Sequence, residues 1–256
     1  MKDTTIFEGL DPELMDRVVS RRGAVARSGK MAGALAIASM PVAFGLLARR
    51  AFAQGGLPQG IIDVLNFALT LEYLEDEFYR TGLATAGLIP GEDLPIFQQI
   101  SKHETAHVAL LESVLGANAG AKPTFDFTAG SMFDPFNVYA TFQALSQGFE
   151  DTGVRAYKGQ ATALMADNTI LTTALRIHSV EARHASEVRR LRGRKGWITG
   201  NETDVPELQA IYNGEENTTQ GTVNTVPFGT AASASEAFDE PLTKEAVLAI
   251  AEPFIV

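Results

Sequence analysis

Hydrophobic residues recur every three or four positions in four long stretches of this chain. In the first stretch Ile61, Leu65 and Ala68 fall on one helical face, with polar residues between them. This pattern is typical of an amphipathic helix that packs one side against a core. It predicts four long helices, over residues 58–83, 94–115, 135–166 and 169–191.

The links between these helices predict their arrangement. Short turns at residues 90–93 and 167–168 join the first pair and the last pair, and Gly116 ends the second helix. Pro135 is expected in the first turn of the third helix, where proline is well tolerated. The longer link, residues 117–134, joins the pairs. Two short links and one long one predict an all-α four-helix bundle of two antiparallel pairs with a crossover.

The rest of the chain lacks this pattern. Residues 201–239 are rich in Thr, Asn, Gly, Ser and Ala, and we expect irregular structure there. Residues 241–251 predict a short closing helix that docks through its apolar side chains. The predicted domains are the bundle at residues 54–196 and a C-terminal extension at residues 197–256. Trp197 is expected in the core.

The first 53 residues form a separate segment. Arg21 and Arg22 open a basic stretch, residues 31–48 are apolar and rich in Ala and Gly, and Ala51-Phe52-Ala53 offers a cleavage site. This order resembles a twin-arginine export signal that is cleaved after Ala53. An uncleaved membrane anchor is the alternative, because about eighteen apolar residues nearly span a bilayer. We expect a periplasmic, envelope or extracellular protein with no stable membrane span after cleavage.

Composition narrows the chemistry. The chain of 256 residues has no cysteine, which excludes disulfides, thiolate metal sites, iron–sulfur clusters and a cysteine nucleophile. Removal of residues 1–53 leaves 13 basic and 26 acidic residues, a net charge of −13. That balance disfavours a nucleic-acid partner, because phosphates require a basic surface. The sequence contains no phosphate-binding glycine loop, HExxH zinc-protease motif or nucleophile elbow.

Each half of the predicted bundle carries the same motif. A lone Glu is followed seven residues later by a Tyr, and 31 or 32 residues after that Glu comes a Glu-x-x-His motif on the facing helix. The spacing of three places Glu and His on one helical face, so all six side chains can meet at one level of the core. The lone Glu residues and the tyrosines that follow them are Glu72 with Tyr79 and Glu150 with Tyr157. The Glu-x-x-His motifs are Glu104–His107 and Glu181–His184.

Four carboxylates and two imidazoles suit a pair of metal ions. Two cations close together repel each other, so chelating and bridging carboxylates must neutralise them, and one imidazole per ion leaves positions open for dioxygen or peroxide. Without metal, the buried carboxylates would raise one another's pKa values and destabilise the bundle. The predicted metal ligands are Glu72, Glu104, His107, Glu150, Glu181 and His184, with Glu104 and Glu181 as bridges.

This arrangement resembles the ferritin-like di-iron carboxylate superfamily, in which two helices each give one Glu and two others each give Glu-x-x-His. Residues 65–75 and 238–243 are similar to the branch of exported ferritin-like and desiccation-related proteins. The resemblance covers about residues 58–192 and implies two Fe ions. Manganese is the alternative, because sites of oxygen and nitrogen donors do not choose cleanly between these metals.

One carboxylate next to the motif competes as a ligand. Glu75 lies one helical turn from Glu72. We prefer Glu72 because it continues the apolar stripe and has the repeated spacing to a Tyr. Glu75, Asp76 and Glu77 are then expected to be mostly solvated, with Glu75 as the alternative ligand or a group hydrogen-bonded behind one.

Five further side chains near the motifs leave alternatives open. Tyr79 and Tyr157 are either hydrogen-bonded to a ligand carboxylate, where they could pass an electron, or ordinary core tyrosines. His178 is an alternative extra ligand or hydrogen-bond donor, because it precedes Glu181 by three residues. His103 is expected to point elsewhere and lie at the surface. Asp151 is expected to be solvated or to contact a ligand residue without binding metal itself.

The sequence supports two functions and assigns no catalytic residue. The first is a di-metal oxidase or peroxidase that uses dioxygen or peroxide to oxidise iron or to remove reactive oxygen species. The second is a non-enzymatic stress-protective or structural envelope protein whose metal staples the bundle or whose site is vestigial. An iron-storing cage is disfavoured, because the long extension replaces the compact fifth helix of cage ferritins. A homo-oligomer is compatible with either function.

Overall fold

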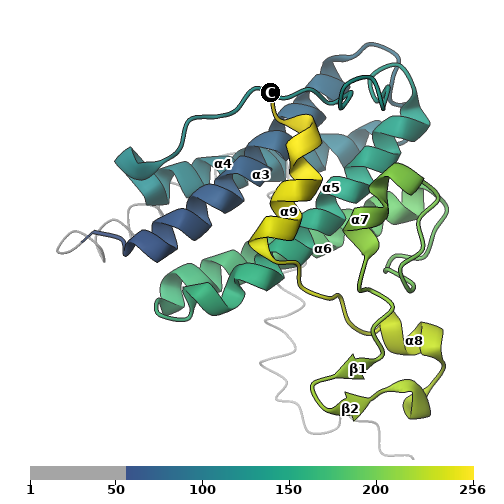
Figure 1. The fold of residues 1–256 in the computed structure, drawn as a ribbon. Coiled ribbons are helices and arrows are strands. Elements are labelled where there is room, and N and C mark those ends of the chain that lie inside the picture. The colour runs from purple at the N-terminus through teal and green to yellow at the C-terminus, as the bar shows by residue number, and fades with distance from the viewer. Residues whose placement is uncertain (1–55) are drawn as a thin grey trace, which may run out of the picture.

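Four long helices lie side by side in the computed structural model, which describes residues 56–256 (Figure 1). They are α3 (Gln59–Ala84), α4 (Leu94–Leu115), α5 (Tyr139–Gln160) and α6 (Asn168–Leu191). α3 packs along α4 and α5 packs along α6, and the link from α4 to α5 crosses the bundle. The predicted all-α bundle with a crossover is confirmed. The predicted export signal at residues 1–53 lies outside the described residues.

Local sequence explains where two of these helices begin or end. The Asp167 side chain accepts hydrogen bonds from the backbone N–H groups of Thr169 and Ile170, both at 2.9 Å. These bonds satisfy donors that the first turn of α6 leaves free. Gly116 follows α4 with φ of 57°, a left-handed conformation that glycine adopts without a steric penalty; the 3₁₀ helix η1 (Gly116–Asn118) begins there.

The third helix is shorter than the sequence predicted. α5 begins at Tyr139 rather than Pro135, and its last turn gives way to the 3₁₀ helix η2 (Ala161–Leu164) before residue 166. Phe136 explains the late start, because its ring packs against Phe78 with centroids 5.7 Å apart. That contact holds the segment before α5 in the core and away from the line of the helix.

The C-terminal extension is mostly irregular and ends in a docked helix, as predicted. Val247 and Ala251 of this last helix are buried against Phe67, Leu71 and Ala156 of the bundle. The β1 and β2 strands form a small antiparallel hairpin. The elements of the extension are η3 (Pro206–Leu208), α7 (Gln209–Tyr212), β1 (Thr219–Gln220), β2 (Val223–Asn224), η4 (Val226–Phe228), α8 (Ala231–Ser235), α9 (Lys244–Ala251) and η5 (Glu252–Phe254).

The last residues of the chain pair with the crossover. The Asp126 N–H donates to the Phe254 carbonyl oxygen and the Val256 N–H donates to that of Thr124, both at 2.9 Å. The Phe254 ring packs edge-on against Phe149 of α5 at 5.0 Å. The crossover is therefore held against the bundle by the extension.

Two hydrophobic clusters fill the bundle on either side of a buried polar layer. One is rich in aromatic residues and includes Phe78, Phe97, Phe142 and Phe149. The other is mainly aliphatic and includes Leu65, Leu111, Ile170 and Ile177. Trp197, expected in the core, is 48% exposed instead, because the chain has already left the bundle after α6.

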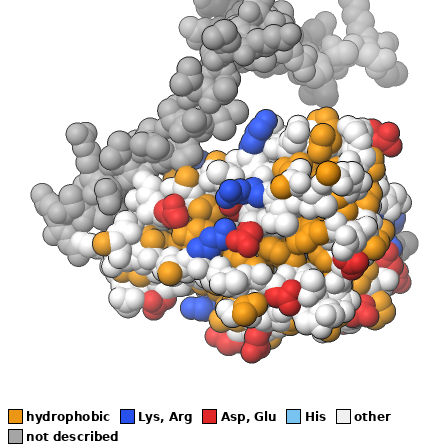
Figure 2. All heavy atoms as spheres, turned by 90° about the horizontal axis from the view of Figure 1, so that it is seen from above, with side chains coloured by type: hydrophobic (Ala, Val, Ile, Leu, Met, Phe, Trp, Pro, Cys, Tyr) orange, Lys and Arg blue, Asp and Glu red, His pale blue; other side chains and the backbone are white. Residues whose placement is uncertain are grey.

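No helix among the described residues is long and apolar enough to cross a membrane. The face seen from above the view of Figure 1 carries hydrophobic side chains with basic and acidic ones beside each other (Figure 2). On this face the charges differ from the continuous basic surface that binds nucleic acid.

Candidate metal centre

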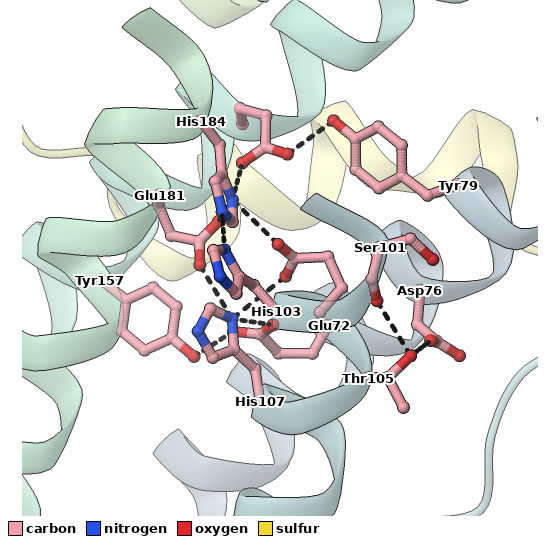
Figure 3. Close-up of polar contacts among 12 residues, drawn as sticks. Glu72, Asp76, Tyr79, Ser101, His103, Thr105, His107, Tyr157, Glu181 and His184 are labelled. Atoms are coloured by element: carbon pink, nitrogen blue, oxygen red, sulfur yellow. Dashed lines mark hydrogen bonds and ion pairs between the residues drawn. The ribbon is translucent and has the colours of Figure 1, made fainter. Parts of the chain in front are cut away.

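All six predicted ligands lie in the polar layer between the two clusters. Each of the four long helices supplies one or two of them, and their ligand atoms lie close together. Figure 3 shows Glu72, His107, Glu181 and His184 pointing toward one another. The four carboxylates are completely buried and the two imidazoles nearly so. The set is Glu72 on α3, Glu104 and His107 on α4, Glu150 on α5, and Glu181 and His184 on α6.

The six residues form two overlapping groups of four. In each group one donor atom per residue lies within 4.8 Å of all the others. Glu104 and Glu181 belong to both groups, which is the arrangement expected of bridging carboxylates. The groups are Glu72, Glu104, His107 and Glu181, and Glu104, Glu150, Glu181 and His184.

Each imidazole faces the carboxylates through its Nδ1 atom. His107 Nδ1 lies 3.2 Å from Glu72 Oε2 and 3.1 Å from Glu104 Oε2. His184 Nδ1 lies 3.1 Å from Glu150 Oε2 and 2.9 Å from Glu104 Oε1. Burial alone would lower the pKa of both histidines, but the carboxylates outweigh it and raise the pKa of each. Without metal, imidazolium protons therefore offset part of the buried negative charge.

The carboxylates divide into two kinds by pKa. Burial and the charge of Glu181 raise the pKa of Glu72 to about 8, although His107 opposes this shift. Burial also tends to raise the pKa of Glu181, but the nearby imidazolium groups of His107 and His184 outweigh it and lower the pKa of this carboxyl. The pKa of Glu104 is lowered in the same way. The carboxylates shared by both groups are thus the ones most readily ionised.

Unsatisfied oxygen atoms in this layer fit a cation. Glu104 Oε1 and both carboxylate oxygens of Glu181 are buried and accept no well-aligned hydrogen bond, although imidazole nitrogens lie nearby. A buried acceptor without a partner costs about 1–3 kcal/mol. Divalent ions bound by oxygen and nitrogen donors would satisfy these oxygens and balance the charge, so the residues present fit a di-metal centre.

The two tyrosines of the repeat are hydrogen-bonded to the cluster. The Tyr79 hydroxyl donates to Glu150 Oε1 at 2.6 Å, and the Tyr157 hydroxyl donates to Glu72 Oε1. Each tyrosine therefore holds the lone Glu of the other half of the repeat. Of the two interpretations that the sequence left open, hydrogen bonding to a candidate ligand is the one that the structure shows.

His103 was expected at the surface, and that prediction is wrong. It is half-buried; its Nδ1 lies 2.8 Å from His184 Nε2, and the two rings stack 5.1 Å apart. The exposed Gln99 side chain lies 2.7 Å from the other ring nitrogen of His103. In a bundle each helix packs against two neighbours, so a residue next to Glu104 along α4 can still face α6.

The expectation that Glu75 and Asp76 are mostly solvated is also wrong. Glu75 is 3% exposed and Asp76 5% exposed, and Asp76 Oδ1 accepts a hydrogen bond from Thr105 at 2.6 Å. Gly153 of α5 faces this carboxylate: a Cβ atom there would lie in van der Waals contact, 3.4 Å from Glu75 Oε1 and 3.5 Å from Glu181 Oε2. Burial raises the pKa of Glu75 well above its usual range. Glu75 belongs to neither group of four.

Two other candidates lie apart from both groups. Asp151 is buried, not solvated; it pairs with Arg189 and accepts a hydrogen bond at 2.9 Å from Tyr212 of the extension. His178 is half-buried, and its Nε2 atom has no hydrogen-bond partner. Sequence spacing alone could not separate these residues from the cluster, because it does not say which neighbouring helix each side chain faces.

Comparison with known proteins agrees with the fold and the cluster. The family model of the ferritin-like domain matches residues 60–194. No curated protein matches the chain. The matched residues cover all four long helices and all six candidate ligands. The chain therefore belongs to the ferritin-like domain family.

Proposed function

We propose that this protein is an exported di-metal protein that binds two iron or manganese ions and reacts with dioxygen or peroxide. Its role would be iron oxidation or defence against oxidative stress. The observation that carries the proposal is the pair of overlapping four-residue groups with unsatisfied carboxylate oxygens at their shared members.

The side chains divide the work of holding the ions. Glu72 and His107 would hold one ion, Glu150 and His184 the other, and Glu104 and Glu181 would bridge them. A pair of bound ferrous ions would supply two electrons, which together with two protons are enough to reduce dioxygen to hydrogen peroxide, or hydrogen peroxide to two water molecules.

The hydrogen bonds around the ligands keep the cluster in place. Tyr79 and Tyr157 orient Glu150 and Glu72 through their hydroxyl groups. His103 contacts the Nε2 atom of His184 and orients this ring, so that the Nδ1 atom of His184 is directed at the carboxylates. Such partners of ligands commonly change metal affinity by about 10- to 100-fold when they are removed.

Metal content tests this proposal. Mature protein purified from its own host's envelope should contain about two Fe or Mn per chain by elemental analysis. The double variant Glu104→Ala/Glu181→Ala should lose most of this metal, because each of the two metal positions loses the two carboxylates that it shares with the other. Glu112→Gln, an exposed change on α4, is the control and should keep it. Two metals retained by the double variant would refute the site.

A steady-state assay separates the two candidate roles. An oxidase or peroxidase should oxidise added Fe(II) with dioxygen or peroxide over many turnovers. Metal present without turnover would support the structural role, in which the bound ions hold the helices of the bundle together.

Export is tested on the same preparation. Sequencing the N-terminus of the mature protein should find Gln54 first, because cleavage is expected after Ala53. An intact segment before residue 54 would favour the uncleaved anchor.

A further inference from the structure

An apolar cavity lies in the aliphatic cluster. It is lined by residues near the end of the bundle where α3 and α6 begin and α4 ends, an end that can be followed in Figure 1. Side chains from all four long helices form its wall. They include Leu65, Ala68, Leu111, Tyr157, Ala174 and Ile177.

The cavity lies about one helical turn from the carboxylate layer. Three wall residues stand four positions from a candidate ligand on the same helix, and four residues of α-helix span about 6 Å. The pairs are Ala68 and Glu72 on α3, Leu111 and His107 on α4, and Ile177 and Glu181 on α6. Tyr157 lines the cavity from α5 and donates its hydroxyl hydrogen bond to Glu72. One side chain therefore contacts both the cavity and the cluster.

The size of the cavity fits one small molecule. The space that the centre of a water-sized sphere can reach is about 20 Å³, and about 10–15 Å³ is enough for one water. A long acyl or alkyl chain would not fit this space. A diatomic gas would.

The polarity of the wall selects among small molecules. A buried water needs roughly two to four polar partners. The Tyr157 hydroxyl is already bonded to Glu72, and the Thr173 hydroxyl to the Thr169 carbonyl oxygen at 2.9 Å. Gln160 is the other polar wall residue and is half-buried. Hydrogen peroxide loses hydrogen bonds in such a site and dioxygen loses none.

The opposite side of the carboxylate layer is filled by aromatic rings. Phe78 and Phe142 stack with centroids 4.8 Å apart, and Phe97 lies 5.0 Å from Phe142. Tyr79 packs among these rings and holds Glu150. The two halves of the repeat therefore differ, because Tyr79 lies against rings and Tyr157 lies against a cavity.

We propose that this cavity holds dioxygen beside the carboxylate cluster, and that dioxygen rather than hydrogen peroxide is the oxidant of the site. The inference rests on the proposed function and narrows its choice of oxidant. Dispersion contacts with the wall attract an apolar gas into a space that offers water few partners.

Xenon binding tests for the cavity in metal-free protein, because xenon is apolar and binds in cavities of this kind. Crystals of metal-free protein under xenon pressure should show one atom in the cavity. Ala174→Leu fills the space and should abolish this binding, whereas Ile170→Ala enlarges it and should raise the xenon occupancy. Ala144→Leu is the control: Ala144 is 6% exposed and Ala174 7%, and Ala144 does not line the cavity.

The same variants loaded with ferrous iron test the oxidant. Ala174→Leu should slow oxidation by dioxygen about tenfold and leave oxidation by hydrogen peroxide within about twofold of the unchanged protein. Ala144→Leu should change neither rate. Equal losses with both oxidants would overturn the inference, because they would indicate general damage to the site.

The outcomes separate this inference from the proposed function. Absence of xenon from the cavity in protein that binds two metals would overturn the inference alone. Xenon in the cavity of protein that takes up no iron would overturn both, and the cavity would then be a packing defect. Xenon binding together with a selective loss of the dioxygen reaction supports both.

Discussion

Individual side chains in the polar layer are paired across the two halves of the repeat. Tyr79 on α3 holds Glu150 on α5, and Tyr157 on α5 holds Glu72 on α3. A buried carboxyl oxygen that loses its hydrogen-bond donor is left unsatisfied, which costs free energy. These tyrosines therefore tie the antiparallel pairs together at the level of the cluster.

Removing one of these hydroxyls should weaken the metal-free protein. Tyr79→Phe keeps the ring but leaves Glu150 without this donor, so the free energy of unfolding should fall by about 1–3 kcal/mol. Tyr73→Phe is the matched control, because the Tyr73 hydroxyl donates to Glu112 at 2.6 Å and water can replace it at that exposed carboxylate. Urea unfolding of both variants measures the difference, and equal losses would contradict it.

Glu215 should make stability depend on pH. It lies 2.8 Å from Arg155 Nε, yet burial raises its pKa from 4.5 to about 7. Between these values the folded protein binds a proton that the unfolded chain has released. The stabilisation is therefore complete below about pH 4.5 and is lost as the pH rises through about 7.

Glu215→Gln should remove this dependence. The stability of the unchanged protein relative to the variant should fall by on the order of 3 kcal/mol across this pH range. Chemical denaturation at a series of pH values measures this difference. Glu207→Gln, an exposed change in the same extension, is the control. A constant difference between Glu215→Gln and the unchanged protein would refute the assignment.

At the scale of elements, the C-terminal extension approaches α5 closely. This helix carries glycines where a side chain would collide with its neighbours. A Cβ atom on Gly159 would lie 1.9 Å from the Leu242 carbonyl oxygen, and one on Gly148 would lie 3.0 Å from the Ile211 side chain. Both contacts come from the extension. The glycines weaken α5 as an isolated helix and allow the extension to pack on it.

A pair of glycine substitutions should have effects of opposite sign. Alanine is the better helix former by about 1 kcal/mol, so local preference alone predicts stabilisation at either site. Gly60→Ala on α3 meets nothing within 4 Å and should stabilise the protein by about 0.5–1 kcal/mol. Gly159→Ala should destabilise it by about 1–3 kcal/mol, because the Leu242 backbone must move. Thermal unfolding of the two variants checks the signs, and stabilisation by both would disprove the close contact.

At the scale of the whole molecule, a buried arginine joins the extension to the bundle. Arg155 of α5 is 1% exposed. Its guanidinium donates to the carbonyl oxygens of Glu240 at 2.8 Å and Asn213 at 3.0 Å, and its own carbonyl oxygen accepts from the Leu242 N–H at 3.1 Å. Bonds to two distant parts of the extension make the irregular segment a part of the folded unit.

Replacing this arginine should release the extension. Arg155→Met leaves Glu215 buried without its partner, a change that costs about 3–5 kcal/mol in comparable pairs. Limited proteolysis followed by mass spectrometry should find new cuts between residues 213 and 242, while the bundle stays intact. Arg183→Met, at an exposed position on α6, is the control. Equal protection of the extension in both variants would show that Arg155 does not hold it.

Local pattern was enough to predict the four helices, the crossover and the docked terminal helix. Helical periodicity and turn residues act over a few positions, so they are visible in one sequence. The six candidate ligands could also be predicted from the sequence, because a repeated motif at matched spacing places them at one level of a bundle. The start of α5 could not be predicted, since the contact of Phe136 with Phe78 depends on a residue far away in the chain.

Only the tertiary structure decided which side chains share the polar layer. Glu75 is buried where α3 faces Gly153 of α5, and His103 reaches His184 because α4 and α6 meet there. The same motif stands in both halves of the repeat, yet Tyr79 lies among rings and Tyr157 beside a cavity. Periodicity assigns a face of a helix, whereas the neighbours of that face are set by packing between segments distant in sequence.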